Sequence, residues 1–156
     1  VPPVKYSATD FLAVNPFYPK INNLEVCGKD AVCTANQMRR KANFVRLKAL
    51  QLFASPGDDL QVPWQTSLLS KYSKVDTVDE IETKFSTLTM LPAQETDEYK
   101  HDLYGLRTLD QAGGLFFHPI PGIGHNCWLF DYVPIGKTDV CLFQPNFEKN
   151  VLPVLV

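Results

Sequence analysis

The pattern of apolar and polar positions indicates a surface helix in the first third of the chain. Met38, Ala42 and Val45 recur at helical spacing, and charged and polar side chains occupy the positions between them. Thr34 stands just before this pattern and is a residue type that commonly caps helices. The sequence therefore predicts a helix over residues 35–46 with Thr34 as its N-cap.

Two apolar runs of strand length follow. Residues 48–54 form one run and residues 115–119 the other, and each ends in a loop that contains proline and glycine. Further helices are expected near 77–85, over 98–112 with a break at Gly105, and around 138–152. Helices that alternate with apolar strands predict a parallel α/β sheet.

Residues 1–34 differ from the rest of the chain, because four prolines and several asparagines interrupt any regular element beyond one helical turn near 9–14. Only the two apolar runs are convincing parallel strands. A two-stranded sheet is marginally stable in water, so we expect another polypeptide to complete the fold.

Composition narrows the functional classes. The chain has 156 residues, the size of one domain, with 45% hydrophobic and 21% charged residues. A net charge of −2 provides no basic field for nucleic acid, and no apolar run has the length of a membrane-spanning helix. The chain begins at Val1 without an initiator methionine or a signal-type segment, so we expect upstream residues to have been removed or to lie outside this sequence.

The four cysteines form two pairs that are close in sequence, Cys27 with Cys33 and Cys127 with Cys141. This spacing is consistent with two small disulfide loops in an oxidising compartment, and four reduced thiols remain the alternative. We expect no metal site, because there is no C-x-x-C motif and the three histidines are scattered; no cofactor is expected either.

Candidate chemistry lies in the loops that follow the two strands. Asp58 follows the first strand, where an aspartate can accept a hydrogen bond from an imidazole, although Asp58 and Asp59 also suit an ordinary solvated turn. His125 follows the second strand in a loop whose glycines, Gly122 and Gly124, would let the backbone approach closely; it too could be an ordinary loop residue.

The two loops are more informative together than separately. An aspartate, a crossover helix, a strand and then a histidine is the second half of the Ser…Asp…His order of α/β hydrolases. The sequence therefore favours Asp58 as the acid and His125 as the base of a catalytic triad. His101 and His118 have no comparable setting.

Five short motifs resemble the palmitoyl-protein thioesterases, in the order in which that family has them. They are residues 11–13 (FLA), 19–23 (PKINN), 63–67 (PWQTS), 104–110 (YGLRTLD) and 122–128 (GIGHNCW). The resemblance implies the C-terminal half of an α/β-hydrolase fold, with residues 1–34 as part of a lid insertion and residues 35–156 as part of the core. It also implies hydrolysis of long-chain acyl thioesters in a lysosomal or secreted setting.

The resemblance assigns the family's acid to Asp58, with Asp59 as the fallback, and its base to His125. It places Phe11, Leu12 and Phe17 where they would line an acyl groove. It matches Cys141 to a family cysteine. The disulfide partner of that cysteine differs in this chain, and Cys127 is expected in its place.

The chain departs from the family in one decisive respect, because it contains no G-x-S-x-G nucleophile motif and no oxyanion-hole loop before it. Without them this chain is not expected to hydrolyse thioesters by itself. We therefore expect an N-terminal chain or subunit that carries the serine. The alternative is a structural or interaction protein that reuses the hydrolase scaffold and keeps the Asp–His pair as an inherited hydrogen bond.

Overall fold

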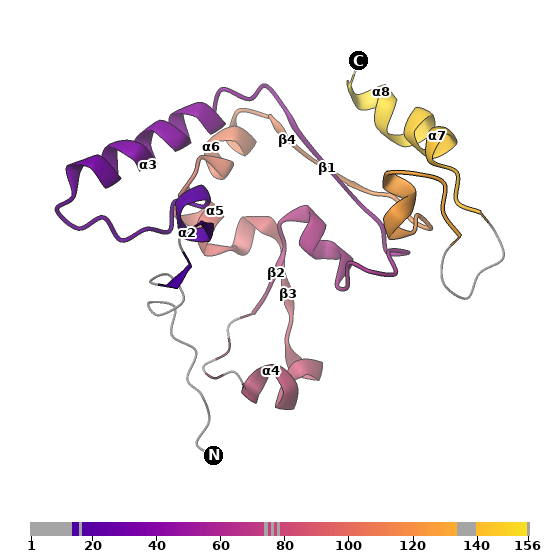
Figure 1. The fold of residues 1–156 in the computed structure, drawn as a ribbon, viewed down its shortest axis with the longest axis horizontal. Helices are drawn as coiled ribbons and strands as arrows, with labels where there is room; N and C mark the ends of the chain where they lie inside the picture. The colour runs from indigo at the N-terminus through magenta and orange to yellow at the C-terminus, as the bar shows by residue number, and fades with distance from the viewer. Residues whose placement is uncertain are drawn as a thin grey trace. The chain divides into compact units, whose positions relative to one another are not determined.

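A computed structural model of the chain describes residues 14, 15, 17–73, 75, 77, 79–133 and 140–155 (Figure 1). The chain divides into two compact units, which we call unit 1 and unit 2. Unit 1 comprises Val1–Ala49 and Tyr72–Gly114, and unit 2 comprises Leu50–Lys71 and Leu115–Val156. The prediction that residues 1–34 belong to a lid insertion stays a prediction.

Unit 1 is built mainly from short helices. Leu106, Leu109 and Ala93 are its most buried apolar side chains. Its helices are α2 (Tyr18–Ile21), α3 (Ala31–Phe44), α4 (Asp79–Thr83), α5 (Asp97–Lys100) and α6 (Leu106–Gln111). Strand β3 (Met90–Leu91) forms a two-stranded sheet with β2 (Lys71–Tyr72). The predicted helix near 77–85 and the break at Gly105 are confirmed.

Helix α3 begins earlier than predicted. Its N-cap is Asp30, whose carboxylate accepts hydrogen bonds from the backbone N–H groups of Val32 and Cys33 at 2.9 and 3.0 Å. Thr34 lies inside the first turn, and its hydroxyl donates to the backbone oxygen of Asp30. The assignment of Thr34 as N-cap is therefore wrong, because the aspartate already satisfies the free amides of the first turn.

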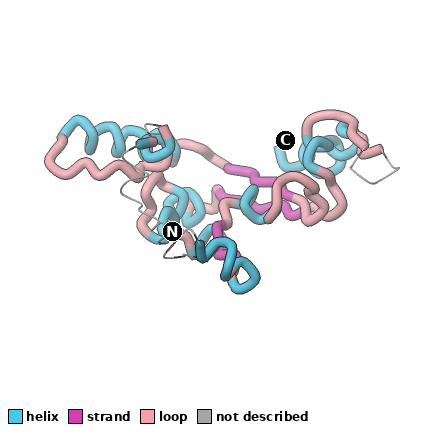
Figure 2. The backbone as a smooth tube through the Cα atoms, turned by 60° about the horizontal axis from the view of Figure 1, so that its bottom comes forward, coloured by secondary structure: helices cyan, strands magenta, loops and turns pink. Residues whose placement is uncertain are grey.

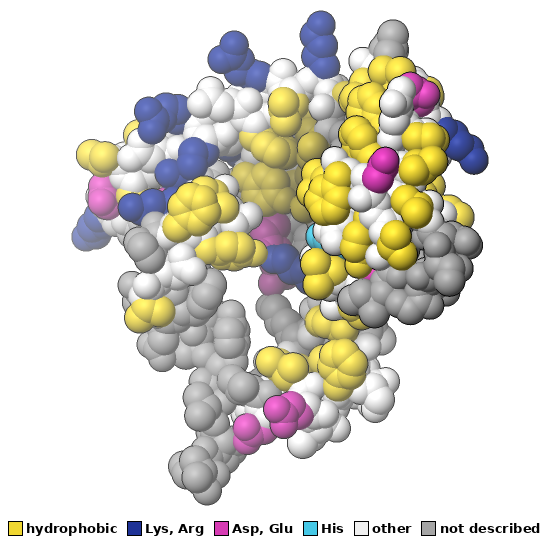
Figure 3. Space-filling view, turned by 45° about the vertical axis from the view of Figure 1, so that its right-hand side comes forward, with side chains coloured by type: hydrophobic (Ala, Val, Ile, Leu, Met, Phe, Trp, Pro, Cys, Tyr) yellow, Lys and Arg dark blue, Asp and Glu magenta, His cyan; other side chains and the backbone are white. Residues whose placement is uncertain are grey.

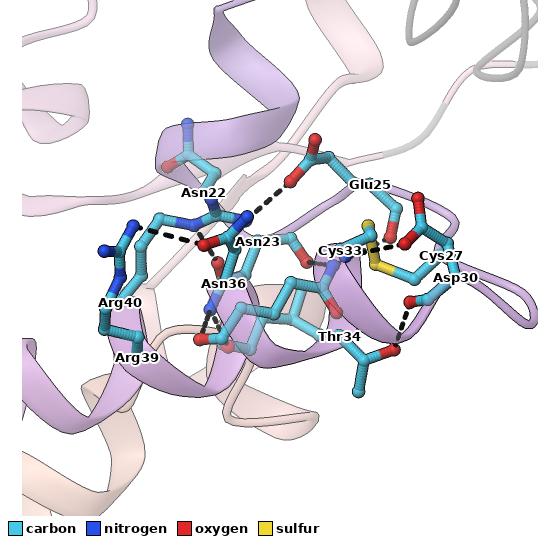
Figure 4. Close-up of polar contacts among 12 residues, drawn as sticks. Asn22, Asn23, Glu25, Cys27, Asp30, Cys33, Thr34, Asn36, Arg39 and Arg40 are labelled. Atoms are coloured by element: carbon cyan, nitrogen blue, oxygen red, sulfur yellow. Dashed lines mark hydrogen bonds and ion pairs between the residues drawn. A yellow bond between two sulfur atoms is a disulfide. The ribbon is translucent and has the colours of Figure 1, made fainter.

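Polar contacts hold the segment before α3 against that helix, as Figure 4 shows. The buried amide of Asn23 donates to the backbone oxygens of Gln37 and Leu103 at 3.0 and 2.9 Å, and its oxygen accepts from Arg40 Nε at 2.7 Å. Arg40 also pairs with Glu25 at 2.5 Å. Together with the Cys27–Cys33 disulfide, these contacts fix an otherwise irregular stretch of unit 1.

Unit 2 contains the predicted parallel pair of strands. Strand β1 (Leu50–Ala54) pairs with β4 (Leu115–Pro119) in a register that runs from Leu50 opposite Leu115 to Ala54 opposite Pro119 (Figure 2). Because a parallel pair needs a crossover, the chain returns to β4 only after it has built part of unit 1. The α/β class predicted from the sequence is confirmed.

The C-terminal helix of unit 2 starts later than the predicted residue 138. It runs through α7 (Phe143–Asn146), a π-helical turn (Phe147–Val151) and α8 (Leu152–Leu155). Cys141 cannot be helical, because it forms an antiparallel bridge with Tyr132 and a disulfide with Cys127. Residues 134–139 lie outside the described part of the chain. Both predicted disulfides are present, so the alternative of four reduced thiols does not hold.

Large apolar side chains remain exposed on unit 2. Hydrophobic side chains gather around its C-terminal helices in Figure 3. Leu129 is 70% exposed and Leu155 is 59% exposed, and Phe130, Val140, Leu142 and Leu152 are exposed as well. No helix among the described residues is long and apolar enough to cross a membrane.

Candidate active site

The acid loop (residues 55–61) begins where β1 ends. Asp58 lies in this loop with only 6% of its side chain exposed. Its Oδ1 accepts hydrogen bonds from the backbone N–H groups of Leu60 and Gln61 at 2.9 and 2.6 Å. A local turn of this kind is typical of aspartate, and here it fixes the direction of the carboxylate.

The base loop (residues 120–126) begins where β4 ends. Its His125 opens a 3-10 turn, His125–Trp128, and the imidazole Nδ1 lies 3.0 Å from Asp58 Oδ2 and 3.2 Å from Asp58 Oδ1. The two residues meet because parallel strands end at the same sheet edge, where Ala54 stands opposite Pro119. The predicted juxtaposition of Asp58 and His125 is therefore found in the structure.

The contact with Asp58 leaves one ring nitrogen of His125 open. With its Nδ1 on the carboxylate, Nε2 is the nitrogen that remains for a reacting group, and 34% of the His125 side chain is exposed. Within the part of the chain that the structure describes, no side chain forms a hydrogen bond to Nε2. A carboxylate that binds Nδ1–H fixes the tautomer and stabilises the imidazolium that forms when Nε2 takes a proton.

The backbones of the two loops touch. The sequence suggested that Gly122 and Gly124 permit this close approach, but the tight contact lies at Gly57. A Cβ added at Gly57 would lie 3.1 Å from the Cα of Gly122, which is tighter than most real Cβ contacts, so the base loop would have to shift slightly. Gly122 itself has open space around it, but its φ of +79° favours glycine. The close approach is therefore permitted by Gly57 of the acid loop. Gly124 has a φ of −71°, which any residue can adopt.

Asp59, the fallback for the acid, binds another part of the same histidine. Its Oδ1 accepts the backbone N–H of His125 at 3.1 Å, and its Oδ2 accepts the Tyr132 hydroxyl at 3.4 Å. Ser55, the first residue of the acid loop, is fully buried. Ser55 Oγ accepts the N–H groups of Gly57 and Ile123, both at 2.9 Å. Serine and aspartate at a strand end were the available signal for these contacts.

The other two histidines, His101 and His118, lie outside the two loops. His118 Nε2 lies 2.6 Å from Gln51 Oε1, and its ring stacks on Phe53 with 4.7 Å between centroids. His101 is exposed at the end of α5. No three His, Cys, Asp or Glu side chains of the described residues gather as metal ligands would.

The expected acyl groove stays a prediction, because Phe11 and Leu12 lie outside the described residues. Phe17, in unit 1, is 68% exposed.

Comparison with known proteins identifies the family of the chain. The family model described as palmitoyl protein thioesterase matches residues 4–125, and so includes both Asp58 and His125. The lysosomal thioesterase PPT2-B of Xenopus laevis is 29% identical over 118 residues, which are 76% of this chain and 34% of that protein. The lysosomal thioesterase PPT2 of Bos taurus is 33% identical over 88 residues, which are 56% of this chain and 25% of that protein.

The chain thus spans between a quarter and a third of the length of these relatives. The match extends over both loops and the parallel strands before them, and the mixed architecture is that of a partial α/β-hydrolase fold. The chain belongs to the palmitoyl protein thioesterase family.

Proposed function

We propose that this chain supplies the acid Asp58 and the base His125 of a serine thioesterase that hydrolyses long-chain acyl thioesters. The observation that carries the proposal is the 3.0 Å contact between His125 Nδ1 and Asp58 Oδ2 at the edge of the parallel strands. The nucleophilic serine and the oxyanion hole come from polypeptide outside this sequence, because no G-x-S-x-G motif lies within it.

The chemistry follows from the orientation of the imidazole. Nε2 takes the proton of the serine hydroxyl as that oxygen attacks the thioester carbonyl, and Asp58 stabilises the resulting imidazolium. The leaving thiolate then takes that proton as the carbon–sulfur bond breaks, which returns the imidazole to its neutral form. In the second half of the reaction Nε2 removes a proton from water, which attacks the acyl-enzyme, and returns this proton to the serine oxygen as the fatty acid leaves.

The proposal includes a partner that completes the fold. The relatives are three to four times as long as the region they share with this chain. The β1–β4 pair is a two-stranded sheet, and apolar side chains such as Leu129 and Leu155 are exposed in the same unit. Additional strands, on a separate chain or on another part of the same polypeptide, would cover such surfaces.

We place the protein in the lysosome. Both relatives are named as lysosomal thioesterases, and the two disulfides suit a compartment outside the cytosol.

Substitution of the two residues tests the assignment. Asp58→Asn and His125→Ala, made in the protein assembled with its nucleophile-bearing part, should each lower kcat for a palmitoyl thioester about 10⁴-fold. His101→Ala is the control. It changes an exposed residue of unit 1 that lies outside both loops, and it should retain full activity. Normal turnover by the Asp58 and His125 variants would contradict the roles.

A labelling experiment separates this function from that of a non-catalytic scaffold. Purified assemblies would be treated with a fluorophosphonate probe that modifies reactive serines. A labelled segment or chain that remains bound to this one supports the enzyme. An assembly that folds and associates but takes up no probe supports the structural alternative.

A further inference from the structure

Two side chains connect the acid loop to the backbone of the base loop. Ser55 Oγ accepts the N–H of Ile123 at 2.9 Å, and Asp59 Oδ1 accepts the N–H of His125 at 3.1 Å. The two amides stand two residues apart, on either side of Gly124. The base loop is therefore held at two points by oxygen atoms of the acid loop.

Among the residues that the structure describes, neither amide has a backbone acceptor that would make these side chains redundant. Ile123 precedes the 3-10 turn, and His125 is its first residue, so its N–H has no partner within the turn. Backbone N–H groups near a protein interior are nearly always paired. Without Ser55 the partly buried N–H of Ile123 would lose its acceptor, and without Asp59 the exposed N–H of His125 would bond water, which does not connect the two loops.

Each side chain is itself fixed. Ser55 is 0% exposed, and its Oγ also accepts the N–H of Gly57 in its own loop at 2.9 Å. Asp59 lies next to Asp58 in the chain and has a second contact, from the Tyr132 hydroxyl to its Oδ2. Close contact between Gly57 and Gly122 leaves little room for the loops to slide past each other.

We propose that Ser55 and Asp59 are positioning residues, which hold the backbone of the base loop so that the His125 imidazole meets Asp58. The two adjacent aspartates thus bind different parts of one histidine: Asp58 binds its ring and Asp59 binds its backbone N–H. The catalytic consequence rests on the proposed function, whereas the loop attachment itself does not.

The structural part is tested by backbone hydrogen exchange at single-residue resolution. Asp59→Ala should speed exchange of the His125 N–H at least tenfold and affect Ile123 less. Ser55→Ala should do the reverse, with Ile123 and Gly57 as the faster amides. Asp59→Asn keeps an acceptor oxygen and should protect the His125 N–H nearly as well as the native residue. Glu82→Ala, an exposed carboxylate in unit 1, is the matched control and should change neither amide.

The catalytic part is tested with the assembled protein. Asp59→Ala should lower kcat about 10²-fold with little change in KM, because a shift of about 1 Å at a catalytic group has an effect of that size. Asp59→Asn should recover most of that loss, which a role of Asp59 as the acid would not allow.

The outcomes separate the two claims. Unchanged exchange at His125 in Asp59→Ala, or equal acceleration of all amides, would overturn the loop attachment. Faster exchange at His125 with full kcat would overturn the positioning role. A third outcome is that the variants show the selective exchange changes but the correctly assembled native protein hydrolyses no thioester. This result would support the loop attachment and contradict the proposed function.

Discussion

Asp102 shows how strongly one buried carboxylate can depend on its neighbours. It is 6% exposed, and Lys41 Nζ lies 2.7 Å from its Oδ2. Its oxygens also accept the N–H and the hydroxyl of Thr108 at 3.0 and 2.6 Å. Burial alone would raise the pKa of Asp102, but the hydrogen bonds from Lys41 and Thr108 outweigh it and hold the pKa below the ordinary value of 3.8.

This lowered pKa predicts an acid dependence of stability. A carboxyl group with a lower pKa in the folded state stabilises the fold above its unfolded pKa, and this contribution disappears as the pH falls through the folded value. We expect the free energy of unfolding to drop below pH 3.8, by about 1.4 kcal/mol for each unit by which folding lowers the pKa.

Urea unfolding over a pH series would measure the effect. Asp102→Asn removes the titrating group, so this variant should be less stable at neutral pH and should lose less stability in acid. Parallel pH curves for the native protein and the variant would contradict the prediction.

The residue scale is also where sequence-based prediction reached its limit. Asp58 and His125 could be identified because parallel strands end at one edge and bring their following loops together. The choice of Asp58 over Asp59 rested on the family resemblance. Serine and aspartate at a strand end were the available signal for the contacts of Ser55 and Asp59, but the partners could not be foreseen, because side-chain bonds to loop amides depend on φ and ψ values that have no sequence period.

Helix α3 illustrates prediction at the scale of the element. Its middle was predictable from apolar spacing, although no residue of the helix is buried and Met38 of that pattern is 69% exposed. The start is set by Asp30, which accepts two amide hydrogen bonds. The start of the C-terminal helix was misplaced for a different reason, since the pairing of Cys141 with Tyr132 overrides local preference.

Substitutions at the two possible caps of α3 would distinguish them. Asp30→Ala should lower the free energy of unfolding by about 1 kcal/mol, because two amides of the first turn lose their acceptor. Asp30→Asn keeps an acceptor and should retain most of this stability. Thr34→Ala, the control, should cost less than half as much as Asp30→Ala in a chemical denaturation experiment. A larger loss of unfolding free energy for Thr34→Ala than for Asp30→Ala would show that Thr34 is the N-cap.

At the scale of the whole molecule, the chain has more apolar surface than its own described elements cover. The parallel sheet has two strands, and large side chains around α7 and α8 are exposed. Sheets of this size are rarely stable without further strands or helices against them. The small size of the parallel sheet was predictable, because only two apolar runs in the sequence had the length and setting of parallel strands.

The chain produced alone should therefore self-associate. Size-exclusion chromatography should show species larger than the 17.6 kDa monomer, and a dye that fluoresces on apolar surfaces should bind. Co-production with the proposed nucleophile-bearing polypeptide should suppress both signals. A monomer that binds no dye would show that the exposed side chains need no cover.

The division of unit 2 into two separated segments has a consequence for the order of events during synthesis. Asp58 leaves the ribosome 67 residues before His125, and most of the residues between them belong to unit 1. At roughly 5–20 residues per second, β1 spends on the order of several seconds without its parallel neighbour. During that interval the strand is open to chaperones and to wrong pairings. Asp58 and His125 therefore meet late in the synthesis of the chain, after unit 1 has had time to fold.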